Sequence, residues 1–172
     1  MPHISFLGIG LMGAPMVARL LDAGFSLTLW NRTPDKAQRF ADRALIAASP
    51  AQAVAGADVV ITMLEDGAVV DQVLYQSGAI AGLRPDTLVI DMSSIEPATA
   101  RRHGAQVTQQ GGGYLDAPVS GGTRGAQAGT LSIMAGGSDQ DFDRAGLIFP
   151  ALGQATPIVP VGMGQPAELA TP

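Results

Sequence analysis

The sequence predicts an α/β fold built on a doubly wound, mainly parallel sheet. Short apolar runs alternate with segments of helical periodicity along the 172 residues, which is typical of β-α-β units. Several runs are apolar at nearly every position, as expected for strands that helices cover on both faces. The first run leads directly into a glycine-rich segment at residues 6–16, where such a fold makes its first turn.

Seven strands and six helices are expected, and two helix starts support this assignment. Thr33-Pro34 and Ser49-Pro50 each place a hydroxyl at the N-cap and a proline at the first helical position, where its missing N–H costs nothing. The expected strands are Ile4–Leu7, Leu27–Trp30, Val59–Met63, Leu88–Asp91, Tyr114–Asp116, Leu131–Ala135 and Pro157–Val159. The expected helices lie near Leu11–Ala23, Pro34–Arg43, Pro50–Ala55, Ala68–Tyr75, Pro97–Gln110 and Gln140–Leu152.

The glycine-rich segment has the spacing G-x-G-x-x-G and joins the first strand to the first helix. Gly8 allows the tight turn, Gly10 lets the backbone approach a pyrophosphate, and Gly13 lets the helix pack closely on the sheet. The anion would lie at the helix N-terminus, where free N–H groups and the dipole favour negative charge. The alternative is a glycine-rich turn without a ligand. The predicted cofactor-binding residues here are Gly8, Ile9, Gly10, Leu11, Met12 and Gly13.

Composition excludes several classes of protein. The net charge is −5 and the arginines are scattered, so no basic stripe suggests a nucleic-acid partner. No apolar run approaches the ~20 residues that span a bilayer, and no signal peptide is recognisable, so we expect a cytoplasmic protein without a membrane partner. The absence of cysteine rules out disulfides, zinc thiolate sites and thiol nucleophiles.

The residues after the second expected strand favour NADP over NAD. An NAD site places Asp or Glu there to accept a hydrogen bond from the ribose 2′-hydroxyl, whereas this chain has Asn31 and Arg32. Arg32 can pair with a 2′-phosphate, with Asn31, Thr33 and Lys36 as further donors. The alternative interpretation is a polar turn with a helix cap.

Two more strand ends carry candidate site residues. Met63 ends the third expected strand and Leu64 follows it, and both are predicted to contact the ribose and nicotinamide. The adjacent Glu65 and Asp66 suggest a carboxylate pair or metal site, but acidic residues before a helix are ordinary partners of its dipole, and we favour that role. Ser94 follows the fourth expected strand and can cap the next helix, face the nicotinamide, or do both.

The segment DAPVSGG at residues 116–122, followed by GTLSIMAGG at residues 129–137, is the second strong signal. A hydroxyl followed by two glycines leaves backbone N–H groups open to a ligand, a suitable cradle for a small carboxylate. Ser120, Gly121 and Gly122 are therefore the predicted substrate-binding residues. These two segments, the loop at residues 8–16 and the stretch 91–94 together resemble the β-hydroxyacid dehydrogenase family over nearly the whole chain.

This resemblance implies a Rossmann-type NAD(P)-binding domain at residues 1–161 and reversible hydride transfer on a small 3-hydroxy acid or its semialdehyde. In the family, the residues matching Ser120, Gly121 and Gly122 bind the substrate carboxylate, and the serine matching Ser94 lies beside the cofactor. Residues 162–172 would begin the interdomain segment, and the helical C-terminal domain of the family is absent from this sequence. The surface that this domain covers would be open to a second copy or another partner.

The sequence departs from the family pattern at the catalytic lysine. Glu168 stands at that position, and Thr171 replaces the asparagine that contacts the substrate. The lysine exchanges a proton with the substrate oxygen, and an anionic glutamate would instead oppose the substrate carboxylate. No replacement is evident, because Lys36 is the single lysine and His103 is expected on a solvated helix face. We therefore assign no catalytic residue.

Three functions are compatible with these observations. The first is an NADP-dependent oxidoreductase of the β-hydroxyacid type, with chemistry impaired in this chain. The second is a non-catalytic NADP-binding module that senses cofactor or completes an enzyme in trans. The third is imine reduction, which uses a related fold with a similar Trp-Asn-Arg-Thr turn. The carboxylate cradle at residues 116–122 speaks against this third function.

Overall fold

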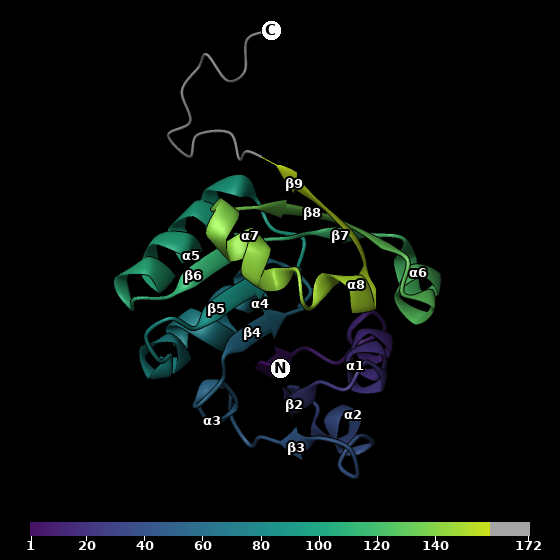
Figure 1. Ribbon diagram of the computed structural model, residues 1–172. Coiled ribbons are helices and arrows are strands. Elements are labelled where there is room, and N and C mark those ends of the chain that lie inside the picture. Colours follow the sequence, from purple (N-terminus) through teal and green to yellow (C-terminus); the bar gives the residue numbers. More distant parts are fainter. Residues whose placement is uncertain (159–172) are drawn as a thin grey trace, which may run out of the picture.

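The computed structural model describes residues 1–158 and confirms the predicted α/β class (Figure 1). The described strands are β1 (His3–Leu7), β2 (Ser26–Trp30), β3 (Leu45–Ile46), β4 (Val59–Thr62), β5 (Leu88–Asp91), β6 (Gly113–Asp116), β7 (Val119–Ser120), β8 (Leu131–Gly136) and β9 (Gly153–Ile158). The helices are α1 (Gly13–Asp22), α2 (Pro34–Gln38), α3 (Pro50–Val54), α4 (Gly67–Val70), the π-helix η1 (Asp71–Gln76), the 3₁₀-helix η2 (Ala79–Gly82), α5 (Pro97–Gln109), α6 (Gly122–Ala128), α7 (Asp139–Ala145) and α8 (Phe149–Leu152).

The first six strands form a parallel sheet in the order β3-β2-β1-β4-β5-β6. β1 pairs with β2 on one side and with β4 on the other. The order of the strands therefore reverses beside β1, and the ends of β1 and β4 diverge into helices on opposite faces. Ligands of open parallel sheets bind at the carboxyl ends of the strands beside such a switch point, so the topology places the candidate site after β1, β2 and β4.

The last three strands extend the sheet beyond the parallel region. β6 and β7 both pair with β8 in antiparallel orientation and in the same register, from Asp116↔Gly136 to Ser120↔Ser132. The two short strands thus lie on one line, and β7 passes the level at which β5 and β6 end. β9 pairs with the other edge of β8 in parallel. The hairpin of β7, α6 and β8 consequently carries its tip past the carboxyl edge of the parallel strands.

Alternating residues of the central strands fill two hydrophobic clusters, one on each face of the sheet. Phe6 of β1 belongs to one cluster and its neighbour Leu7 to the other. The first cluster includes side chains of α1, α6, α7 and α8, and the second includes side chains of α3, η1, η2 and α5. Burial on both faces explains why these strands are apolar at successive positions.

Several element boundaries differ from the sequence prediction. β3, β7 and α6 were not expected, and α1 begins at Gly13 rather than Leu11 because the residues before it complete the turn. The helix expected at Gln140–Leu152 is interrupted between α7 and α8, where Gly146 is a poor helix former. Ser49 caps α3 by accepting from the Gln52 N–H, whereas Thr33 makes no capping hydrogen bond with its side chain.

His103 corrects the expectation of a solvated helix face, since its side chain is fully buried. Ala100, His103 and Val107 are the buried positions of α5, and their spacing defines the inward stripe of a helix. The imidazole stacks on the Tyr75 ring with centroids 4.0 Å apart. Its Nε2 lies 2.6 Å from Oδ1 of Asp71, so His103 fastens α5 to the π-helix η1.

No helix within residues 1–158 has the length and apolar character that crossing a bilayer requires. The predicted interdomain segment, residues 162–172, together with Glu168, Thr171 and the last residue of the strand expected at Pro157–Val159, lies outside the described residues.

Candidate functional site

The three glycines of the first turn have different physical roles. Gly8 has a φ of +107°, and a Cβ there would overlap the carbonyl oxygen of Met63. A Cβ at Gly13 would overlap the carbonyl oxygen of Gly8, so the first and third glycines are required by the fold itself. A Cβ at Gly10 would meet no heavy atom of the described part of the chain within 4 Å. The second glycine thus leaves open space at the start of α1, where a pyrophosphate can approach the backbone.

Asn31 holds this loop against the end of β2. Its Oδ1 accepts a hydrogen bond from the Ile9 N–H at 2.7 Å, and its Nδ2 donates to the Thr33 carbonyl at 3.0 Å. Asn31, which the sequence suggested as a phosphate donor, therefore uses its oxygen and one N–H in hydrogen bonds within the protein. Ile9 itself is buried and Leu11 is 84% exposed, so a ligand on this loop would meet Ile9 only through its backbone.

A cleft of about 130 Å³ opens at the ends of β1, β2 and β4. This volume is small beside the roughly 300–1,000 Å³ of a typical ligand pocket, so the cleft can hold only one end of a dinucleotide. Predicted site residues that line it are Gly8, Gly10, Asn31, Arg32, Thr33, Lys36, Met63 and Leu64. Trp30, Glu65, Val69 and Val73 also line it and were not predicted, although the two valines have helical spacing after β4.

Five predicted cofactor residues do not line this cleft: Ile9, Leu11, Met12, Gly13 and Ser94. Gly13 lies beneath the turn, as described above. Ser94 is exposed after β5, and it does not cap α5, because Glu96 occupies the N-cap position. The serine that sequence reasoning missed is Ser93, whose Oγ accepts from the Leu64 N–H at 2.9 Å. Ser93 thereby joins the ends of β4 and β5.

Charged groups face one another across the cleft. Nη2 of Arg32 lies 3.6 Å from Oε1 of Glu65, with both side chains largely exposed. Lys36 adds a second cation to the lining. Asp66, next to Glu65, accepts from the Val69 N–H at 3.0 Å and caps α4. The two neighbouring acids therefore have separate roles, and Asp66 serves the helix start as predicted.

The predicted carboxylate cradle lies at the tip of the hairpin formed by β7, α6 and β8. Ser120, Gly121 and Gly122 are exposed there, beyond the carboxyl edge of the parallel strands. Gly121 and Gly122 have φ values of +128° and +63°, conformations that favour glycine. Among the described residues, a Cβ at Gly122 would meet no heavy atom within 4 Å, so this part of the structure leaves the backbone at the tip accessible to a ligand.

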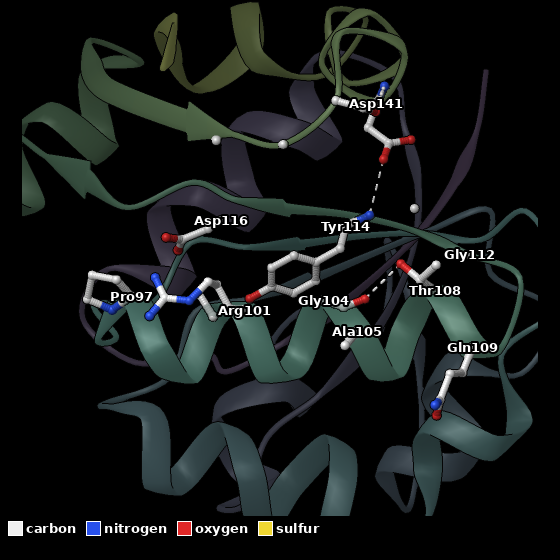
Figure 2. Close-up of a pocket in the computed structure, with 15 residues that line it drawn as sticks. Pro97, Arg101, Gly104, Ala105, Thr108, Gln109, Gly112, Tyr114, Asp116 and Asp141 are labelled. Carbon is white, nitrogen blue, oxygen red and sulfur yellow. Dashed lines mark hydrogen bonds between the residues drawn. The ribbon is translucent and has the colours of Figure 1, made fainter. Parts of the chain in front are cut away.

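A larger groove, of about 560 Å³, lies between α5, β6 and the start of α7 (Figure 2). The Tyr114 ring lies in this groove over Gly104 of α5, and its backbone N–H donates to Oδ2 of Asp141 at 3.3 Å. Within residues 1–158, the Tyr114 hydroxyl and Oδ1 of Asp116 are buried there without a hydrogen-bond partner. Burial, and then the nearby Asp91 carboxylate, raise the pKa of Asp116 to about 6. Sequence reasoning did not identify this groove.

Comparison with known proteins supports the same interpretation of the first turn. The NAD binding domain of 6-phosphogluconate dehydrogenase matches residues 3–162. The NAD-dependent L-serine dehydrogenase of Pseudomonas aeruginosa is 41% identical over 172 residues, which are 98% of this chain and 58% of that protein. The chain belongs to the β-hydroxyacid dehydrogenase family. Its described turn at Gly8, Gly10 and Gly13 is thus part of an NAD(P)-binding domain.

Two further relatives show how much of the family this chain spans. The 2-hydroxy-3-oxopropionate reductase of Escherichia coli is 36% identical over 157 residues, covering 91% of this chain and 54% of the enzyme. A solved structure of 3-hydroxyisobutyrate dehydrogenase from Mycobacterium tuberculosis with L-serine has a TM-score of 0.87 and 41% identity, covering 99% of this chain and 58% of that one. The chain therefore spans little more than half the length of these β-hydroxyacid dehydrogenases.

Proposed function

We propose that the protein belongs to an NADP-dependent oxidoreductase that transfers a hydride between the nicotinamide and a small 3-hydroxy acid or its semialdehyde. The observation that carries this proposal is the open position at Gly10, beside a cleft that Arg32 and Lys36 line. The dinucleotide, when bound, supplies or accepts the hydride. The residues of this chain bind its phosphates and orient it.

The preference for NADP rests on charge. No acidic residue follows β2 directly, and the Arg32 guanidinium can make the charge-assisted hydrogen bonds that a 2′-phosphate accepts. Lys36 of α2 also lines the cleft and offers a second positive charge to the 2′-phosphate. The Pseudomonas relative is named NAD-dependent, so a direct comparison of the two cofactors is needed.

For the substrate, we propose a small carboxylate bound by the backbone N–H groups of Gly121 and Gly122 and the hydroxyl of Ser120. Their exposure and positive φ values support this role, because successive free N–H groups form a concave anion site. The relatives reported above are named for L-serine, 2-hydroxy-3-oxopropionate and 3-hydroxyisobutyrate, all of them small carboxylates. We propose 3-hydroxyisobutyrate or tartronate semialdehyde as the first substrates to test.

We propose that proton transfer is the step at which this chain departs from its family, because Glu168 stands where the family has its lysine. Lys36 is the single lysine of the sequence, and it lines the cleft at the adenosine end rather than the substrate cradle. We therefore propose that this chain alone binds cofactor but is impaired in turnover. The second candidate is a non-catalytic NADP-binding module that senses cofactor or completes an enzyme in trans, with a second copy or another partner on the surface that the family's helical domain covers.

The test is a fluorescence titration of Trp30, the single tryptophan, which lines the cleft. We expect saturable quenching or enhancement with NADPH at lower concentration than with NADH. No response to either cofactor, in a sample with a cooperative thermal transition, would refute the proposed cofactor site. Turnover of 3-hydroxyisobutyrate or tartronate semialdehyde then separates the oxidoreductase from the binding module.

A further inference from the structure

Glu65 is the one acidic residue among those that line the cleft in the described part of the chain. It follows β4, whereas its partner Arg32 follows β2, and β1 lies between these strands. The two side chains nevertheless meet across the cleft, with 3.6 Å between Nη2 and Oε1. The carboxylate thus faces the guanidinium that the proposed function assigns to the 2′-phosphate of NADP.

The backbone on both sides of Glu65 is fixed. The N–H of Leu64 donates to Oγ of Ser93 at 2.9 Å. Asp66 is held at the start of α4, where its carboxylate accepts from the Val69 N–H. Because both neighbours are anchored, the Glu65 side chain is presented to the cleft by the fold. An exposed acid on a free loop would not have this constraint.

We infer that Glu65 competes with the 2′-phosphate for Arg32 and thereby limits the preference of the cleft for NADP over NAD. The inference rests on the proposed function. Binding of NADP must separate Arg32 from Glu65, and it brings a phosphate of about −2 charge close to a carboxylate. Binding of NAD requires neither, and its 2′-hydroxyl can donate to the same carboxylate. Glu65 therefore weakens binding of NADP and not of NAD.

The experiment measures dissociation constants of NADPH and NADH, by Trp30 fluorescence, for the wild-type chain and for Glu65→Gln. The amide keeps the size of the side chain and removes its charge. Because Glu65→Gln removes an exposed ion pair and a nearby like charge, we expect a gain in NADPH affinity of roughly three- to tenfold, with NADH affinity unchanged or lower. At about 1 M salt, where the screening length is about 3 Å, the gain should fall below roughly twofold.

Two further variants make the test specific. Arg32→Ala removes the cation for which the two anions compete, so adding Glu65→Gln in that background should give a smaller gain in NADPH affinity than in the wild-type chain, because only the direct repulsion by the carboxylate remains. Asp42→Asn is the matched control, because Asp42 is exposed and does not line the cleft. This substitution changes the net charge by the same amount as Glu65→Gln. Thermal unfolding confirms that each variant is folded.

The outcomes separate this inference from the proposed function. If the wild-type chain binds NADPH but Glu65→Gln changes neither cofactor, or changes both equally, the inference is wrong and the proposed function stands. A gain of the same size in Asp42→Asn would also overturn the inference, since it would indicate a general effect of net charge. If the folded wild-type chain binds neither cofactor, the proposed function itself is wrong.

Discussion

Replacement of Gly10 by alanine separates cofactor binding from folding. The new methyl group would meet no heavy atom of residues 1–158 within 4 Å, and Gly10 does not have a positive φ. The free energy of unfolding should stay the same or rise by up to about 1 kcal/mol, because alanine reduces the entropy of the unfolded chain. The same methyl group occupies the space through which a pyrophosphate approaches the backbone.

The expected loss of affinity follows from the contact that the methyl group prevents. A hydrogen bond to a charged group contributes about 1.5–3 kcal/mol, and every 1.4 kcal/mol is about tenfold in the dissociation constant. NADPH and NADH should therefore both bind roughly 10- to 150-fold more weakly to Gly10→Ala than to the wild-type chain. The measurement is the Trp30 titration, combined with urea unfolding of the same samples.

Gly13→Ala is the matched variant, since its methyl group would overlap the carbonyl oxygen of Gly8. Overpacking of this kind costs about 1–3 kcal/mol or more, so this variant should lose stability as well as affinity. The reasoning would be refuted if Gly10→Ala bound NADPH as tightly as the wild-type chain, or if it lost as much stability as Gly13→Ala.

Three further predictions concern polar groups around the sheet. His103→Phe keeps an aromatic ring but removes the hydrogen bond to Asp71, so urea unfolding at pH 7 should show a loss of about 1.5–3 kcal/mol. Burial raises the pKa of Asp71, but the hydrogen bonds from the His103 imidazole and the Arg102 guanidinium outweigh burial, so the net pKa lies below the ordinary 3.8. The loss of stability in His103→Phe should therefore shrink as the pH falls through that lowered pKa. Asp116 has a folded pKa of about 6 against an ordinary 3.8, so stability is greatest below the ordinary value and falls as the pH rises through 6. The difference between the two pKa values of Asp116 is equivalent to about 3 kcal/mol, and the partial exposure of the side chain reduces this destabilisation to about 1–2 kcal/mol. Asp116→Asn should recover that free energy of unfolding at pH 7.5 but not at pH 4. Asn31→Ala removes the acceptor of the Ile9 N–H and should weaken NADPH and NADH equally in the Trp30 titration, whereas unequal effects would indicate a direct contact with the 2′-phosphate.

Much of the candidate cofactor site could be predicted because its constraints are local. The requirement for glycine at positions 8, 10 and 13 arises within one strand, one turn and one helix, so spacing along the sequence reports it directly. Arg32 and Lys36 follow the next strand of the same unit, and the parallel register brings them to the same edge. The boundaries of the later helices were less predictable, because the packing of α7 and α8 on the first hydrophobic cluster decides where the chain turns.

The alternation of apolar runs and helical segments determined the fold class, since only a sheet buried on both faces uses strands of that composition. Only the tertiary structure decided which polar side chains meet. Glu65 faces Arg32, Asn31 holds Ile9, and His103 is buried against Asp71, although 22 to 33 positions separate the partners in each pair. The physical reason is that strand order and helix packing bring these residues together, whereas the periodicity of the sequence reports only the local structure of each strand or helix.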